Sequence, residues 1–169
     1  MTSKTLVPVE EYLRMSFDGP DPEYLDGEIV ERHLPSAPHS KTQKRLLKFF
    51  DSLEQSVFLS AYPEITLRLS PSRYRVADVA VFAGDIPEAM EYPIEPPEIA
   101  VEIVSKGDRH VAIVEKLAEY HAWGVKHVWL VDPWTKKLFV YDSGGLRETT
   151  SLELPEFSAR LSRGEIFGA

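Results

Sequence analysis

The sequence predicts an α/β or α+β fold built on a mixed central sheet flanked by helices. At 169 residues, with 43% hydrophobic and 27% charged residues, the chain suits one compact domain spanning residues 1–169. A strand–helix–strand succession over residues 99–132 implies a right-handed parallel crossover. The central elements also follow the order helix, strand, strand, strand, helix, strand, with an N-terminal hairpin and a C-terminal extension around them.

A short helix and a hairpin are expected near the N-terminus. Residues 8–16 have a helical pattern. Residues 23–25 and 28–30 flank Asp26-Gly27, a dipeptide favoured in two-residue hairpin turns. We expect this hairpin to lie at the edge of the sheet.

The pattern of residues 40–57 predicts an amphipathic helix with one basic side. Opposite its apolar residues stand four cations and no anion: Lys41, Lys44, Arg45 and Lys48. Such faces are usually only solvated. In a chain of net charge −8, however, this face would supply the phosphate contacts of a nucleic-acid binder if it flanks the active site. His39, which precedes the helix, is a candidate substrate or metal contact, although surface and capping histidines are commoner.

The rest of the chain supplies the strands of the sheet and a second helix. Residues 99–104 are apolar almost throughout, as in a central strand that is covered on both faces. Asp108 is expected to cap the following helix, which ends at Gly124. The predicted strands are residues 65–69, 74–82, 99–104, 126–132 and 138–141.

Two carboxylates, Asp78 and Glu102, stand inside apolar strand patterns, where burial argues against them. Each therefore needs a partner, a metal ion, a proton or an opening to solvent. An ion pair with a nearby cation would explain either residue alone, the candidates being Arg73, Arg75 and Lys126. Two carboxylates on neighbouring strands, each beside small residues, better suit a hard divalent cation such as Mg²⁺.

The second helix carries a lysine, Lys116, at the border of its polar side. A helical projection groups four residues on one side of this helix: Val111, Val114, Ala118 and His121. From the border, Lys116 can extend toward the sheet. An exposed ion pair with Glu119 at i+3 is the commoner arrangement, and spacing alone favours it.

Four ordered motifs carry a resemblance to a known family: YRVADVAV (74–81), PEIAVEIVS (97–105), EKLAEY (115–120) and VWLVDP (128–133). From about Glu23 to Phe157, the chain resembles the Uma-type restriction endonucleases, a bacterial branch of the PD-(D/E)XK nuclease superfamily. The core of that superfamily has the same order of helices and strands. The resemblance therefore implies a restriction-endonuclease-like fold.

The resemblance also implies a set of site residues. Asp78 and Glu102 would be catalytic and bind Mg²⁺, or Mn²⁺ as a substitute, with the carbonyl of Ile103 as a further metal ligand. The lysine usual two residues after Glu102 is replaced by Val104, and in this branch it looks to have moved to the following helix. Lys116 is then the third catalytic residue, against the preference from spacing alone. Two further positions recur in the branch without an assigned role: Glu23 and His39.

The predicted function is metal-dependent endonuclease cleavage of phosphodiester bonds in nucleic acid, expected to be DNA. Two alternatives stay open. One is a nuclease-like fold that binds nucleic acid or protein without cleaving it, and the other is a hydrolase of small phosphorylated molecules. With no apolar N-terminal segment, no membrane-length apolar run and no cysteine, the sequence predicts a cytoplasmic protein without a membrane partner. A homodimer is expected by family analogy, because two strands have to be cut.

Overall fold

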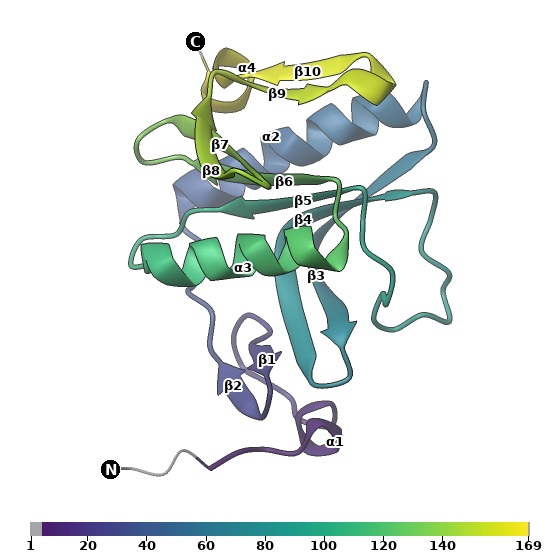
Figure 1. Cartoon of the computed structure of the whole chain (residues 1–169), viewed down its shortest axis with the longest axis vertical. Helices are drawn as coiled ribbons and strands as arrows, with labels where there is room; N and C mark the ends of the chain where they lie inside the picture. Colours follow the sequence, from purple (N-terminus) through teal and green to yellow (C-terminus); the bar gives the residue numbers. More distant parts are fainter. Residues whose placement is uncertain (1–4, 169) are drawn as a thin grey trace.

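The computed structural model describes residues 5–168 and contains a large mixed sheet between two long helices (Figure 1). The helices are α1 (Val9–Tyr12), α2 (Ala37–Glu54), α3 (His110–Trp123) and α4 (Arg163–Phe167), with a 3₁₀ helix at Pro155–Phe157. The strands are β1 (Glu23–Leu25), β2 (Glu28–Val30), β3 (Leu59–Ser70), β4 (Arg73–Ala83), β5 (Ile99–Ile103), β6 (His127–Asp132), β7 (Lys137–Asp142), β8 (Gly145–Thr149), β9 (Ser151–Leu154) and β10 (Ala159–Ser162).

The main sheet has eight strands in the order β2-β1-β4-β5-β6-β7-β8, and β3 pairs with β4 beside this path. β5 and β6 are parallel and are joined by α3, as the predicted crossover requires, and the other neighbouring pairs are antiparallel. The succession α2, β3, β4, β5, α3, β6 confirms the predicted mixed class and its order of elements. β9 and β10 form a separate hairpin.

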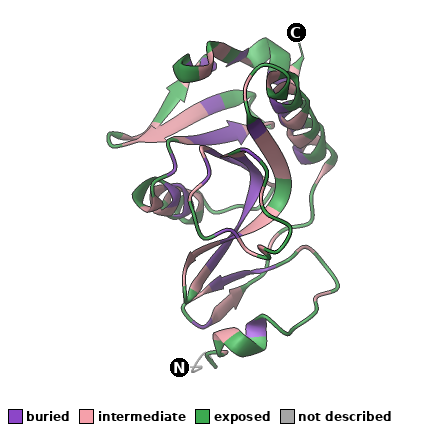
Figure 2. Ribbon diagram, turned by 90° about the vertical axis from the view of Figure 1, so that its right-hand side faces the viewer, coloured by how far each residue is buried: buried purple, intermediate pink, exposed green. Residues whose placement is uncertain are grey.

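Apolar clusters cover both faces of the sheet. On one face, Phe50 of α2 stacks on Trp129 of β6, with ring centroids 6.1 Å apart. On the other face, Leu117 of α3 packs in a cluster with Ala80 and Ala100. Figure 2 shows the buried central strands between the two helices. This burial on both sides explains the continuous apolar pattern of β5, since a strand without a solvent face has no reason to alternate.

Local backbone chemistry sets the ends of several elements. Ser36 caps α2 by accepting a hydrogen bond from the N–H of His39 at 3.4 Å. Gly124 ends α3 with a φ of 114°, in the left-handed region, and confirms the predicted helix end. β3 begins at Leu59, before the predicted residue 65. The sequence pattern missed this start because Pro63 interrupts it. A proline is tolerated there since β3 lies at an edge, beside β4.

Two predictions near the helices need correction. Asp108 is not the cap of α3, because Arg109 takes that position and the Asp108 carboxylate accepts from the N–H of Ser105 at 2.7 Å. The N-terminal helix is shorter than residues 8–16, with α1 ending at Tyr12. The predicted hairpin is confirmed, and β2 lies at the end of the strand order. None of the helices in residues 5–168 is both long enough and apolar enough to cross a membrane.

Candidate active site

The candidate site lies where one edge of β4 changes partner. β1 pairs with β4 as far as Tyr74, and β5 pairs with it from Val79. Residues 75–78 therefore lie between the two ladders on that edge. Here the backbone N–H and carbonyl of Val76 are bound by side chains, a carboxylate at 3.0 Å and an ammonium at 2.7 Å. Buried backbone groups require hydrogen-bond partners. Here polar side chains supply these hydrogen bonds in place of a neighbouring strand.

Asp78 lies at the end of this gap with both carboxylate oxygens bound. Oδ2 accepts from the backbone N–H of Ile103 at 2.7 Å, and Oδ1 lies 3.0 Å from Arg32 Nη2 and 3.3 Å from His39 Nε2. Burial raises the pKa of Asp78, but the hydrogen bond with His39 and the charge of Lys116 outweigh it, and the pKa lies below its ordinary value. Asp78 is therefore a buried anion that also ties β4 to β5.

Glu102, on β5, is bound by two side chains of α3. Its Oε2 accepts from Lys116 Nζ at 2.8 Å and its Oε1 from the Tyr120 hydroxyl at 3.0 Å. Burial and the nearby carboxylates raise the pKa of Glu102 to about 8, although the charge of Lys116 opposes the shift. A divalent cation bound beside Glu102 would lower this pKa and favour the ionised form that a metal ligand requires.

Lys116 is buried, with 9% of its surface exposed. Its Nζ lies within 2.8 Å of three acceptors: Glu102 Oε2, Glu23 Oε1 and the carbonyl of Val76. Although burial lowers the pKa of Lys116, the neighbouring carboxylates raise it above its ordinary value, so the side chain is an ammonium. The exposed pair with Glu119 expected from spacing is wrong, because Glu119 binds Arg73 and Arg75 instead.

The simple ion pairs considered for the two carboxylates are also wrong. Arg75 binds Glu23 and Glu119, and Lys126 binds Glu98 on the surface. The cation beside Asp78 is instead Arg32, from the segment after β2.

Further residues around Asp78 come from separate elements. Arg32 bridges two carboxylates, with Nη1 2.6 Å from Glu64 Oε2 and Nη2 3.0 Å from Asp78 Oδ1. Gln43 of α2 donates to Glu64 Oε1 at 3.0 Å and to the carbonyl of Asp78 at 2.8 Å. The sequence did not single out Arg32, Gln43 or Glu64, because each stands among polar residues in a loop, a helix or a half-exposed strand.

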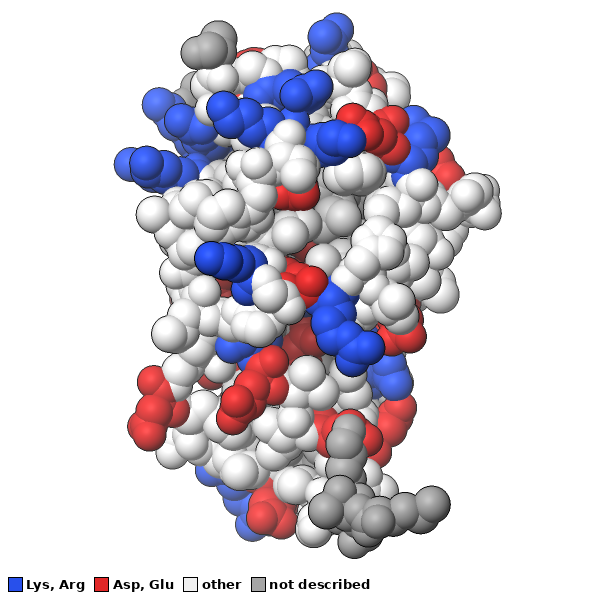
Figure 3. Space-filling model, turned by 90° about the vertical axis from the view of Figure 1, so that its left-hand side faces the viewer, with Lys and Arg blue, Asp and Glu red and all other residues white. Residues whose placement is uncertain are grey.

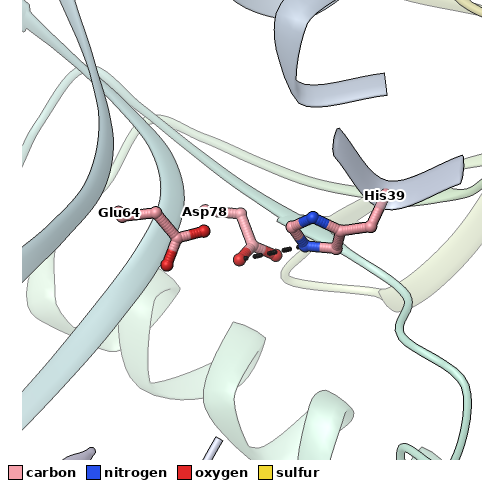
Figure 4. A group of neighbouring side chains, drawn as sticks. All are labelled: His39, Glu64 and Asp78. Carbon is pink, nitrogen blue, oxygen red and sulfur yellow. Dashed lines mark ion pairs between the residues drawn. The ribbon is translucent and has the colours of Figure 1, made fainter. Parts of the chain in front are cut away.

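The side chains around Asp78 offer ligand atoms that suit a divalent cation. Figure 4 shows His39, Glu64 and Asp78 converging from α2, β3 and β4, and one ligand atom of each lies within 4.8 Å of the others. Glu102 adds carboxylate oxygens to the lining of the same cleft. Carboxylate oxygens suit Mg²⁺ and Mn²⁺, and an imidazole nitrogen is compatible with the latter as well.

The residues that the sequence assigns to the site lie together in one cleft of about 810 Å³, lined by Asp78, Glu102, Ile103 and Lys116 among others. Ile103 reaches the site through its N–H, which binds Asp78. Figure 3 shows Asp and Glu side chains in a hollow on the left-hand side of the molecule as seen in Figure 1, and Lys and Arg side chains gathered above it. α2 flanks the cleft through His39 and Gln43, so the basic helix lies where a role in substrate binding requires it.

A second hollow of about 410 Å³ continues from the cleft along α2. It shares Ser40 and Gln43 with the cleft and is also lined by Lys44 and Lys48. Of the other two cations on the basic side of α2, Lys41 lines neither hollow, and Arg45 donates to the backbone carbonyl of Ile166 in α4 at 2.7 Å and so holds the C-terminal segment. Lys44 and Lys48 therefore lie beside the cleft.

Comparisons with known proteins agree with this geometry. The family model Uma2, described as "Putative restriction endonuclease", matches residues 9–167. A crystal structure described as that of "a putative nuclease belonging to DUF820 from Anabaena variabilis ATCC 29413" has a TM-score of 0.83 to this chain at 21% sequence identity, covering 95% of this chain and 97% of that one. None of the curated proteins that were compared matches the sequence. The fold is therefore the restriction-endonuclease-like fold.

Proposed function

Because the chain belongs to the Uma2 family of nucleases, we propose that it is a metal-dependent endonuclease that hydrolyses phosphodiester bonds of nucleic acid, with DNA as its substrate. One observation carries the proposal. Two buried carboxylates and a buried ammonium, those of Asp78, Glu102 and Lys116, converge on one open cleft. A fold has no structural need for such a cluster, because apolar residues of similar volume cost less to bury.

Asp78, Glu102 and the carbonyl of Ile103 are the proposed ligands of Mg²⁺, for which Mn²⁺ would substitute. His39 and Glu64 share the space around Asp78 and are further candidate ligands. A divalent cation held there would neutralise charge on the scissile phosphate and lower the pKa of a bound water.

Lys116 is proposed to orient the attacking water and to offset the charge that develops on the phosphate. Its three short contacts fix the ammonium in place, so little reorganisation is needed when that charge appears. Because the neighbouring carboxylates keep it protonated, Lys116 acts as a hydrogen-bond donor and not as a general base.

The exposed lysines of α2 are proposed to contact the nucleic-acid backbone. Lys44 and Lys48 line the hollow that continues from the cleft. Contacts of this kind position a strand without reading its bases, so binding should weaken as salt rises and show little base preference.

The test is cleavage of plasmid DNA, single-stranded DNA and RNA with Mg²⁺ or Mn²⁺, with EDTA as a control. The informative variant is Asp78→Asn, which keeps an oxygen that can accept from Ile103 but removes the charge. We expect cleavage to fall by at least about 100-fold. Cleavage that persists in this variant or in EDTA would refute the proposal. Metal binding with no cleavage of any nucleic acid would instead favour a non-catalytic binding module.

A further inference from the structure

Glu23 has a buried carboxylate beside Lys116, and the proposed reaction does not use it. It is 5% exposed and belongs to β1 of the N-terminal hairpin, outside the succession of core elements. Its Oε1 lies 2.7 Å from Lys116 Nζ and accepts from the N–H of Val76 at 3.0 Å, and its Oε2 lies 2.7 Å from Arg75 Nη1. The carboxylate thus joins the hairpin, β4 and α3 at one point.

The three contacts of Lys116 divide into two kinds. An ammonium has three N–H bonds, and each has an acceptor here. Glu23 and the carbonyl of Val76 lie outside the proposed set of metal ligands, whereas Glu102 belongs to it. Two N–H bonds therefore anchor the ammonium away from the proposed metal ligands, and the third donates to Glu102, which is one of those ligands.

Glu23 also supplies the charge that a buried ammonium requires, since an unpaired buried charge is strongly destabilising. The charges of Lys116 and Arg75 outweigh the effect of burial and lower the pKa of Glu23 to about 2. Glu23 therefore stays ionised. On its other side, Arg75 also donates to the Glu119 carboxylate at 2.8 Å.

A cluster of tyrosines holds the hairpin that carries Glu23. Tyr24, the next residue in β1, pairs with Tyr74 of β4. Tyr12 packs on both, with ring centroids 4.9 Å from Tyr24 and 5.7 Å from Tyr74. Because adjacent strand residues point to opposite sides, this cluster anchors β1 on one side and presents Glu23 on the other.

We propose that Glu23 is a positioning residue for Lys116: its carboxylate fixes the ammonium relative to Glu102 and makes the N-terminal hairpin a required part of the active site. The catalytic consequence rests on the proposed nuclease function. The contact between Glu23 and Lys116 can be tested without it.

The kinetic test compares Glu23→Gln with Glu119→Gln in the full chain. Both variants remove one carboxylate from Arg75, but only Glu23→Gln removes charge from Lys116. We expect Glu23→Gln to lower kcat by about 10- to 100-fold, with KM for DNA and the Mg²⁺ affinity measured by calorimetry unchanged. Glu119→Gln should keep the kcat of the wild type. Equal losses in the two variants, with equal shifts in Tm, would overturn the proposal.

A double-mutant cycle separates positioning from a general loss of structure. In a Lys116→Met background, Glu23→Gln should have no further effect on kcat, because it acts through the ammonium. Additive effects would contradict the proposal. Glu23→Asp is a second variant that keeps the charge but shortens the side chain. It should also lose kcat, and an unchanged kcat would show that charge alone, without position, is what matters.

An NMR measurement tests the contact independently of cleavage. In the metal-free protein labelled with ¹⁵N, a hydrogen-bonded lysine ammonium that exchanges slowly with water gives its own signal, assigned by its absence from Lys116→Met. This signal should persist in Glu119→Gln and be lost or broadened in Glu23→Gln. A signal that is unchanged in Glu23→Gln overturns the proposal. If the signal is lost as expected but the wild type cleaves no substrate, the positioning contact is supported and the proposed function fails instead.

Discussion

The two edges of β4 satisfy their backbone groups in different ways. On one edge, β3 pairs with β4 from Leu59 opposite Ala83 to Ser70 opposite Arg73, with a single register shift. On the other edge, β1 and β5 leave residues 75–78 to side chains. The first edge is built by one strand, β3, whose pairing with β4 skips only Glu64 and Leu69 after Leu59, and the second edge holds most of the carboxylates and cations of the candidate site.

This difference shows how an interrupted strand pairing leaves space for the side chains of an active site. A continuous strand partner satisfies the backbone but fills the space beside it. Where the partner is interrupted, Asp78 binds the N–H of Ile103 and Lys116 binds the carbonyl of Val76, so the contacts that hold the sheet also hold the reactive groups. Apart from Glu64, a candidate metal ligand on β3, we therefore expect substitutions on the paired edge to change stability and those on the open edge to change activity.

The largest effect on activity is expected from Glu102→Gln. The variant keeps the size of the side chain but cannot provide a carboxylate for a metal ion. We expect kcat to fall by about 100- to 1,000-fold, measured as plasmid nicking with Mg²⁺. Retention of activity would remove Glu102 from the proposed ligands.

The same variant should also differ from the wild type in how its free energy of unfolding depends on pH. Between about 4.5 and about 8, the unfolded wild type ionises Glu102 while the folded protein keeps the proton, so the wild type loses stability as the pH rises through this window. Glu102→Gln cannot ionise and should become more stable than the wild type toward pH 8. Urea unfolding of the metal-free proteins at both ends of the window measures this. A constant difference between the two proteins would contradict a raised pKa.

On the paired edge, Leu59→Ala should affect stability alone. Leu59 is 3% exposed and packs in the α2-side cluster, opposite Ala83 and away from the cleft. Removing its side chain should lower the free energy of unfolding by about 2–5 kcal/mol. Under conditions where the variant is folded, its kcat should match that of the wild type. A loss of kcat in the folded variant would show that the two edges are coupled.

Within the open edge, Asp78 has a structural and a chemical role that two variants can separate. Asp78→Ala leaves the buried N–H of Ile103 without its acceptor, whereas Asp78→Asn can keep that hydrogen bond. We expect Asp78→Ala to be less stable than Asp78→Asn by about 1–3 kcal/mol, while cleavage falls by about 100-fold or more in both. Chemical denaturation measures the difference, and equal stabilities would mean that the bond contributes nothing net.

The sequence predicts those parts of the fold that depend on local pattern. The apolar run of β5 and the glycine after α3 are visible in any window of a few residues, and so are Asp78 and Glu102, because a carboxylate in an apolar strand is conspicuous. The order of elements follows from these patterns. Family resemblance, and not spacing, pointed to Lys116.

The rest of the site depends on contacts between distant segments. The helical projection grouped Val111 with three other residues on one side of α3 and put Lys116 at the border of the polar side. In the structure, Val111 is 62% exposed and Lys116 is buried. A lysine is buried there because β1 and β5 supply carboxylates, which the periodicity of the helix cannot reveal. Arg32 and Glu64 likewise meet only in the folded chain, 32 residues apart in sequence.

The smallest effect is expected beyond the cleft, on the basic side of α2. Lys44→Glu should weaken DNA binding by roughly 3- to 10-fold near 0.1 M salt and reduce the salt dependence of binding by about one charge, because it removes one phosphate contact. Lys126→Glu makes the same charge change just before β6, outside both hollows, and should leave the affinity near that of the wild type. Fluorescence anisotropy over a salt series measures both variants, and calorimetry should show unchanged Mg²⁺ binding. Equal losses of affinity in both variants would mean that α2 contributes only to the overall charge, and that no separate surface beside the open edge of β4 binds the nucleic-acid backbone.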